Sequence, residues 1–175
     1  MGLELAPADI ATLEERTEGW AIGLQLAAIS MQGRQNISEF VDAFSGGHHY
    51  VLEYLTDEIV GKLSKARRVF LLKTSILRRM CGPLCDYILD TKDSSEVLAD
   101  LQRENLFITS LDDEYYWCRY NHLFVDLLGN ILRKEFSQDE IFALHRKASQ
   151  WHQENGFHRD AIEHAMLAQD FEWAA

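Results

Sequence analysis

Residues 106–128 read LFITSLDDEYYWCRYNHLFVDLL, and this stretch decides the fold. Aromatic and β-branched side chains, which favour strands, crowd into residues 106–111 and 115–120. They flank the acidic triplet Asp112-Asp113-Glu114, so the stretch predicts a β-hairpin with that triplet at its turn. A helix over residues 122–136 should follow at once, because apolar residues recur there at helical spacing.

The residues before the hairpin predict only helices. Two helices are expected within residues 7–33, with a break near Gly19, because apolar residues recur at spacings of three and four. The further helices are expected over these segments: one capped by Asn36 or Ser38 and ending before Gly46-Gly47, then 49–63, 65–77, a short helix that follows the turn at 81–83 and runs through Leu89, and one that starts at Ser94 or Ser95 and closes at Glu104-Asn105. Several helices followed by a two-stranded wing is the order of elements in a winged-helix domain. A generic α+β domain with a hairpin has the same order, so both readings stay open.

The residues after Ser137 return to a purely helical pattern. An apolar stripe runs from Ile141 to Trp151 and ends at Asn155-Gly156, a typical helix stop. A second helix is expected over residues 160–168, and Asp170 is placed to cap a third. A helix pair with small residues in its second helix resembles one unit of a helical solenoid, which needs about three units to bury its faces. We therefore expect this chain to be cut from a longer protein.

The composition indicates an acidic globular protein. The 175 residues carry a formal net charge of -11, and 47% of them are hydrophobic. A uniformly basic surface for nucleic acid is absent, and the best basic patch spans residues 62–79, around the helix predicted over 65–77. The three cysteines form no regular framework, which favours buried, reduced thiols. With no apolar run of about 18 residues and no signal peptide, we expect no membrane contact and a cytoplasmic location.

The sequence contains no complete active site. It lacks the glycine-rich phosphate loop, the dinucleotide-binding turn and the nucleophile elbow of hydrolases. The histidines at positions 145, 152, 158 and 164 and the pair Cys81 and Cys85 do not have the spacing of zinc modules. Solvated or packing roles are expected for them, and we predict a chain that is not an enzyme by itself.

Several blocks of the sequence resemble one family of bacterial regulators. The blocks are RTEGWAIGLQLA at 16–27, FLLKTSIL at 70–77, CGPLCD at 81–86, YNHLFVDLL at 120–128, HRKA at 145–148 and AIEHA at 161–165. In this order they are similar to blocks of the large MalT-like, LuxR-type, ATP-dependent transcriptional regulators, which belong to the STAND signalling ATPases.

The resemblance implies a mainly α fold in three parts. Residues 1–47 would be a helical lid segment of the ATPase module, residues 48–136 a winged-helix domain with a short β-hairpin, and residues 137–175 the first helices of a TPR-like solenoid. The nucleotide-binding domain would precede them, and a DNA-binding helix-turn-helix would follow the superhelix. ATP or ADP with Mg²⁺ is therefore expected only in the full-length protein, with no cofactor in this chain. Its partners would be those missing parts of the same polypeptide and an inducer, either a small molecule or a protein.

The resemblance also assigns a nucleotide-binding role to particular residues. Gly19-Trp20-Ala21 matches the family's G-x-P motif, in which proline packs near adenine; Ala21 replaces that proline here. His122 matches the winged-helix histidine that reaches the β-phosphate of bound ADP in STAND proteins. A histidine that only caps or packs at a strand–helix junction is the alternative. The winged helix would then clamp ADP in an inactive state until an inducer and ATP open it.

Two other functions stay open on the residues alone. The first is a stand-alone helical module that binds a protein or peptide. The second is a small winged-helix DNA-binding factor that uses the basic residues at 62–79, although the acidic composition disfavours it.

Overall fold

The computed structural model describes residues 5–31, 36–44, 60–103 and 108–170. The predicted loop at Gly46-Gly47, most of the predicted helix 49–63 and the helix after Asp170 lie outside these residues. Within the described residues, no helix is long and apolar enough to cross a membrane.

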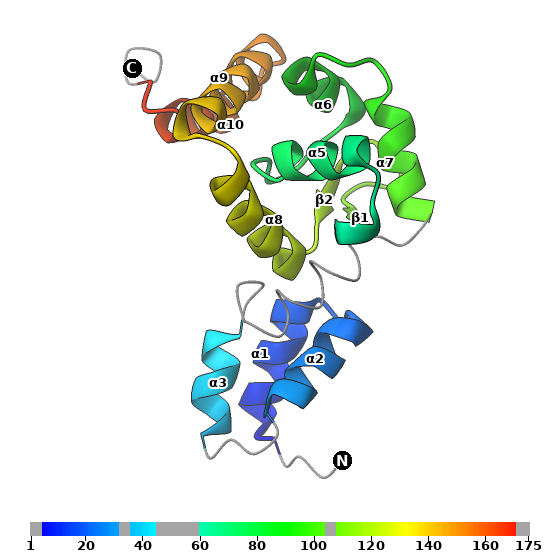
Figure 1. Cartoon of the computed structure of the whole chain (residues 1–175), viewed down its shortest axis with the longest axis vertical. Helices are drawn as coiled ribbons and strands as arrows, with labels where there is room; N and C mark the ends of the chain where they lie inside the picture. Colours follow the sequence, from blue (N-terminus) through cyan, green and yellow to red (C-terminus); the bar gives the residue numbers. More distant parts are fainter. Residues whose placement is uncertain (1–4, 32–35, 45–59, 104–107, 171–175) are drawn as a thin grey trace. The chain divides into compact units, whose positions relative to one another are not determined.

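The fold is mainly helical, with one two-stranded antiparallel hairpin (Figure 1). The helices and strands are α1 (Pro7–Thr17), α2 (Ala21–Met31), α3 (Ile37–Ala43), the 3₁₀ turn η2 (Val60–Lys62), α5 (Lys65–Thr74), α6 (Gly82–Leu89), α7 (Ser94–Arg103), β1 (Ile108–Ser110), β2 (Cys118–Tyr120), α8 (His122–Glu135), α9 (Gln138–Glu154) and α10 (His158–Leu167). The chain divides into two compact units: an N-terminal unit of residues 1–63 with 121–127, and a C-terminal unit of residues 64–120 with 128–175. The predicted mainly α fold with a hairpin is confirmed.

Helices α1, α2 and α3 build the N-terminal unit. The predicted break near Gly19 is confirmed, because Glu18 and Gly19 adopt left-handed conformations with φ of 51° and 71°. Asn36 caps α3 by accepting a hydrogen bond from the backbone N–H of Glu39 at 3.3 Å, as one of the two expected caps. The core side chains of this unit include Leu13, Ala27, Met31, Phe40, Val41 and Phe44.

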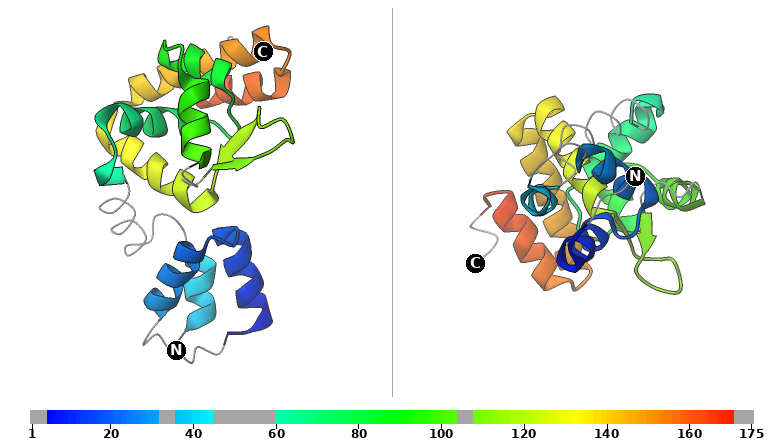
Figure 2. Two further views of the ribbon diagram at one scale, coloured as in Figure 1. Left: turned by 90° about the vertical axis from the view of Figure 1, so that its right-hand side faces the viewer. Right: turned by 90° about the horizontal axis from the view of Figure 1, so that it is seen from below.

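The hairpin lies in the C-terminal unit, where Figure 2 shows its turn extending beyond the helices. Ile108 pairs with Tyr120 and Ser110 with Cys118. Both strands are shorter than the described parts of the predicted 106–111 and 115–120. The Asp112 carboxylate accepts hydrogen bonds from the backbone N–H groups of Tyr116 (2.8 Å) and Trp117 (2.9 Å), so these residues belong to the turn.

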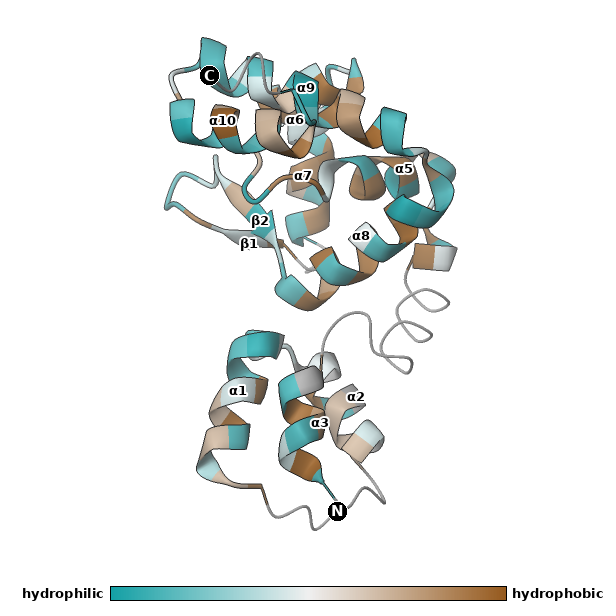
Figure 3. Cartoon of the chain, turned by 90° about the vertical axis from the view of Figure 1, so that its left-hand side faces the viewer, coloured by the Kyte–Doolittle hydropathy of each residue, from teal (hydrophilic) through white to brown (hydrophobic). Residues whose placement is uncertain are grey.

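Helix α5 begins after its predicted cap but ends early. The Ser64 hydroxyl accepts the backbone N–H of Arg67 at 3.3 Å, as expected. The helix stops at Thr74 rather than Leu77, because the Thr74 and Ser75 hydroxyls bond to carbonyls of the last turn, at Phe70 and Leu72. Such side-chain bonds compete with continuation of a helix. The helices that follow show hydrophobic and hydrophilic residues intermixed along their length, as amphipathic helices do (Figure 3).

Helices α9 and α10 form the predicted helix pair and lie side by side (Figure 1). Ser137 and Glu140 make a reciprocal capping box at the start of α9. Gly156 lies in the connection between α9 and α10 and has a positive φ of 79°. Helix α10 begins at His158, two residues before the predicted Asp160. The carbonyl of Phe157 already accepts the backbone N–H of Ala161 at 3.0 Å, which starts the helix earlier.

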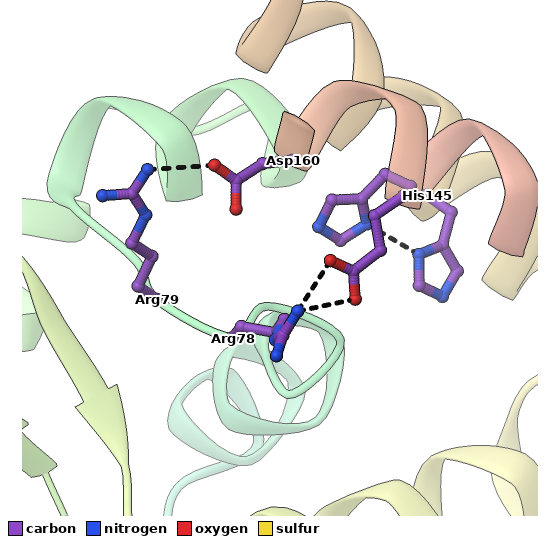
Figure 4. Close-up of polar contacts among 6 residues, drawn as sticks. Arg78, Arg79, His145 and Asp160 are labelled. Carbon is purple, nitrogen blue, oxygen red and sulfur yellow. Dashed lines mark hydrogen bonds and ion pairs between the residues drawn. The ribbon is translucent and has the colours of Figure 1, made fainter. Parts of the chain in front are cut away.

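A cluster around Arg79 joins the hairpin to the helix pair within the C-terminal unit. Its guanidinium carbon lies 4.5 Å from the Trp117 ring centroid and 4.9 Å from that of Phe157. The same guanidinium pairs with Asp160 of α10, at 2.9 Å between Nη2 and Oδ2, as Figure 4 shows. The Arg79 side chain thus contacts Trp117 directly before β2, Phe157 in the connection between α9 and α10, and Asp160 of α10.

Three histidines pack between α9 and α10. The Nδ1 atoms of His145 and His164 lie 2.8 Å apart, so one Nδ1 donates and the other carries no proton, which makes the accepting ring neutral (Figure 4). The His152 and His164 rings stack at 5.5 Å between centroids. All three side chains are buried, whereas His158 is exposed. The expected packing role is therefore confirmed for these three, and the expected burial is confirmed for the cysteines Cys81, Cys85 and Cys118.

Burial of the histidines predicts acid sensitivity. Desolvation lowers the pKa of His145 to about 4 and that of His164 to about 3, and the nearby Arg78 and the other imidazoles lower the latter further against the opposing effect of Asp160. An unfolded histidine titrates near 6.5. The unfolded chain therefore binds protons on these histidines before the folded chain does. The free energy of unfolding is unaffected by them above pH 6.5 and declines as the pH falls toward 4, by roughly 1.4 kcal/mol per pH unit for each histidine.

Urea unfolding followed by tryptophan fluorescence at pH 7 and pH 5 measures this loss. The variant His164→Gln should flatten the pH dependence, whereas His158→Gln, on an exposed side chain, should leave it unchanged. Equal slopes in the two variants would show that the buried histidines do not cause the effect.

The Arg79 cluster predicts unequal roles for two adjacent arginines. Arg79→Ala should lower the free energy of unfolding by about 1–2 kcal/mol, because it removes a partly buried ion pair and two ring contacts. Arg78→Ala removes an ion pair with Glu163 from a side chain that is 69% exposed, and should cost less than about 0.5 kcal/mol. Chemical denaturation of both variants is the measurement, and similar losses would contradict the assigned role of Arg79.

Candidate functional site

The predicted site residues come from two distant parts of the sequence, and the structure brings those parts together. The turn between α1 and α2 holds Gly19 and Trp20, Ala21 begins α2, and α8 begins at His122. Both belong to the N-terminal unit. Asn121 Nδ2 donates a hydrogen bond to the Thr17 carbonyl oxygen at 3.1 Å, which fixes the start of α8 against this turn.

The α1–α2 turn is short and tightly wound. After the left-handed residues Glu18 and Gly19, the backbone N–H of Trp20 donates to the Thr17 carbonyl at 2.9 Å. Gly19 meets the demand for a positive φ, which other residues adopt less readily. Trp20 is half-buried, and Ala21 is the first residue of α2. This geometry explains why a glycine begins the motif.

Gly23 allows a close approach that the sequence reading did not identify. A Cβ atom built on Gly23 would lie 2.8 Å from Cε3 of Trp20 and 3.2 Å from Cδ1 of Leu123. Only a glycine therefore lets α2, the Trp20 ring and the first turn of α8 pack at this spacing. A glycine inside a helical pattern was the available signal.

His122 contacts the carboxylate of Glu18. Its side chain is 71% exposed, and its Nε2 lies 3.3 Å from Oε1 of Glu18. The same Oε1 accepts the backbone N–H of His122 at 3.3 Å. A carboxylate at the N-terminus of a helix is favourable, because free N–H groups and the helix dipole carry positive charge there. Glu18 therefore occupies the position at which an anion at His122 would bind.

Asn121 caps α8 and also escaped the sequence reading. Its Oδ1 accepts the backbone N–H of Leu123 at 3.0 Å, while its Nδ2 reaches Thr17. The side chain is buried, so both polar ends use their partners inside the unit. Asparagine directly before a helical run is an N-cap signal, although the bond to Thr17 could not be read from sequence.

A cleft of about 350 Å³ opens beside His122. Its lining residues are Thr12, Glu15, Arg16, Phe44, His122, Leu123 and Asp126. Arg16 donates to the Phe44 carbonyl at 2.6 Å. Gly19 and Trp20 are not among the described residues that line this cleft, so the structure places these two outside it.

The cleft is lined by side chains of both charges. The cleft offers an imidazole and a guanidinium against the carboxylates of Glu15 and Asp126. Within the described residues, no group of three or more histidine, cysteine or acidic side chains is arranged to hold a metal ion.

Comparison with known proteins identifies the central part of the chain. Residues 56–140 match the family model of the MalT winged helix domain. These residues include α5 to α8 and the hairpin, which is the order of elements described above.

The relatives carry two kinds of name. The chain is 32% identical over 169 residues to the serine/threonine-protein kinase PknK of Mycobacterium tuberculosis, covering 97% of this chain and 15% of the kinase. It is 32% identical over 167 residues to the HTH-type transcriptional regulator MalT of Klebsiella pneumoniae subsp. pneumoniae, covering 93% of this chain and 18% of the regulator. The MalT regulator of Serratia proteamaculans is 31% identical, with the same coverage. The chain thus spans less than a fifth of the length of these relatives.

The two hydrogen bonds of Asn121, to Thr17 and from Leu123, indicate that this side chain stabilises the junction between the α1–α2 turn and the start of α8. Asn121→Ala should lower the free energy of unfolding by about 2 kcal/mol, because it removes two hydrogen bonds at a buried position. Asn36→Ala removes the exposed cap of α3 and should cost about 1 kcal/mol or less. Urea unfolding of both variants is the measurement, and an Asn121→Ala loss no larger than that of Asn36→Ala would contradict the junction's importance.

Proposed function

We propose that this chain is a regulatory segment of a large ATP-dependent transcriptional regulator, because residues 56–140 match the MalT winged helix domain and the whole segment is similar to MalT regulators. In this proposal, residues 1–47 are the lid segment, residues 48–136 the winged-helix domain and residues 137–175 the start of a TPR-like array. The segment latches an ADP-bound inactive state and relays an inducer signal in the cytoplasm. It catalyses nothing by itself, and ATP or ADP with Mg²⁺ belongs to another part of the full-length protein.

One observation carries the proposal: His122 and the Gly19-Trp20-Ala21 turn meet in one compact unit. Asn121 bonds to Thr17, and Glu18 contacts both the imidazole and the backbone N–H of His122. His122 and Gly19-Trp20-Ala21 are about a hundred positions apart in sequence, and these are the residues that the family resemblance assigns to the nucleotide. An adenine near the turn and a phosphate at His122 could therefore be held by a single unit.

The anion contact at His122 suits a phosphate. An imidazole N–H and a backbone N–H at a helix start are both donors that phosphate oxygens accept. The Glu18 carboxylate now uses both donors. A phosphate carries more negative charge than a carboxylate and would compete with Glu18 for these donors. In the latched state the phosphate would take the place of the Glu18 carboxylate.

The outer face of α10 supports a longer helical array. Ile162, Met166 and Leu167 are 48%, 58% and 50% exposed. Ile162 and Met166 share one face of α10, because they are four residues apart, and Leu167 follows directly at the end of the helix. Solenoid units bury such faces against the next helix, so a following helix would cover them. The array would carry the inducer signal toward the winged-helix domain.

The alternatives receive less support from the described contacts. Four arginines of the basic patch form ion pairs inside the C-terminal unit: Arg67 with Asp100, Arg68 with Glu135, Arg78 with Glu163 and Arg79 with Asp160. Arginines held in this way contribute less to DNA binding. A stand-alone helical module that binds a protein or peptide stays the second candidate, although the matched kinase carries its similar segment within a much longer chain.

The proposal predicts an effect of one substitution on nucleotide retention. In the full-length regulator, His122→Ala should weaken ADP binding by about 10-fold, because one charge-assisted hydrogen bond is lost. Basal transcription activity should rise. Equilibrium binding of a fluorescent ADP analogue and a reporter assay measure the two effects.

His158→Ala is the matched control, because His158 is an exposed histidine at the start of another helix. It should leave ADP affinity and basal activity unchanged. An ADP affinity of the His122→Ala protein equal to that of the parent would reject the nucleotide role of His122.

A further inference from the structure

The basic residues around α5 are of two kinds. Its two arginines pair with acidic side chains, Arg67 with Asp100 and Arg68 with Glu135. Lys65 and Lys73 line a groove beside the helix, near its two ends, and Arg67 also lines this groove while pairing with Asp100. The proposed nucleotide latch uses none of these residues.

The groove lies between α5 and the segment from the end of α6 to the start of α7. Its volume is about 600 Å³. The apolar side chains that line it are Ala66, Val69, Phe70, Leu89 and Val97. Ala66, Val69, Phe70 and Lys73 are spaced by three and four residues and so share one face of α5. The wall is therefore mostly apolar, with cations at the rim.

These properties match a site for a small ligand. Small-molecule sites commonly measure about 300–1,000 Å³ and combine apolar walls with a few polar groups that orient the ligand. The groove falls within that range. Val69, Leu89 and Val97 are half-buried, so an apolar ligand would remove further surface from water.

The charges around the groove select the ligand's head group. The net charge of the chain is -11, so a cationic rim departs from its average surface. Lys65 is exposed and begins α5, where the helix dipole also favours an anion. Lys73 lies over the Phe136 ring at 5.5 Å and acts on Glu140 by its charge, so it is engaged elsewhere. Asp93 is the acidic side chain among the described lining residues, and it disfavours a polyanion such as a nucleotide.

We propose that this groove binds a small amphipathic carboxylate, such as a medium-chain fatty acid. The carboxylate pairs with Lys65 at the N-terminal end of α5, and the hydrocarbon lies on Val69, Phe70 and Val97. One negative charge satisfies Lys65, and the apolar wall excludes water from the chain.

The test uses the whole 175-residue chain with dodecanoate below its micellar concentration. Titration followed by two-dimensional NMR should give saturable shifts at Val69, Phe70, Leu89 and Val97. Dodecylammonium, with the same chain and the opposite charge, should bind at least about 10-fold more weakly, since it loses the charge-assisted contact.

Lys65→Glu should weaken dodecanoate binding by about 10-fold or more and narrow the difference between the two probes. The variant should still fold, because an acidic residue in the first turn suits the helix dipole. Lys92→Glu is the matched control: Lys92 is exposed in the α6–α7 connection and is absent from the lining, so its substitution should leave affinity unchanged.

Three results would overturn the proposal. The first is the absence of saturable shifts with dodecanoate. The second is an equal effect of Lys65→Glu and Lys92→Glu, which would indicate a general charge effect. The third is capture of an acidic amphipathic helical peptide at these residues while dodecanoate fails to bind, which would make the groove a peptide site.

Discussion

The hydrogen bond between Asn121 and the Thr17 carbonyl is the contact on which the candidate site depends. It joins residues 104 positions apart and is buried, so both partners lose their hydrogen bonds to water if it breaks. Around it, Asn121 caps α8, Glu18 contacts His122, and Gly23 lets Trp20 and Leu123 approach. A loss at Asn121 would therefore separate the two halves of the proposed nucleotide contact.

Glu18 gives the site an internal anion. Its carboxylate satisfies the donors at the start of α8, so those donors are not left unpaired when no phosphate is present. A ligand phosphate would have to displace the Glu18 carboxylate, and the loss of that contact would reduce the net free energy of phosphate binding. Such competition suits a latch, because the closed and open states then differ by a modest free energy.

The local sequence pattern predicted much of the fold. Aromatic and β-branched residues identified the hairpin, and Ser64, Asn36 and Asn155-Gly156 marked helix ends at the observed places. The errors came from side chains with bonding options that the pattern does not specify. Asp112 draws Tyr116 and Trp117 into the turn, and Thr74 stops α5.

The site was harder to predict than the fold. His122 and the Gly19 turn were singled out only by family resemblance, since no periodicity relates them. Glu18, Asn121 and Gly23 went unrecognised because their roles depend on partners distant in sequence. The buried histidines similarly appeared as scattered residues until α9 and α10 placed His145 beside His164.

The central claim is that His122 exchanges a carboxylate for a phosphate. The most direct measurement is a high-resolution structure of the full-length regulator with ADP, in which the distance from His122 Nε2 to the nearest phosphate oxygen is determined. The account predicts a hydrogen-bond distance of roughly 2.7–3.2 Å, with Glu18 displaced. A bound ADP whose phosphates lie elsewhere, with the contact between Glu18 and His122 intact, would contradict it.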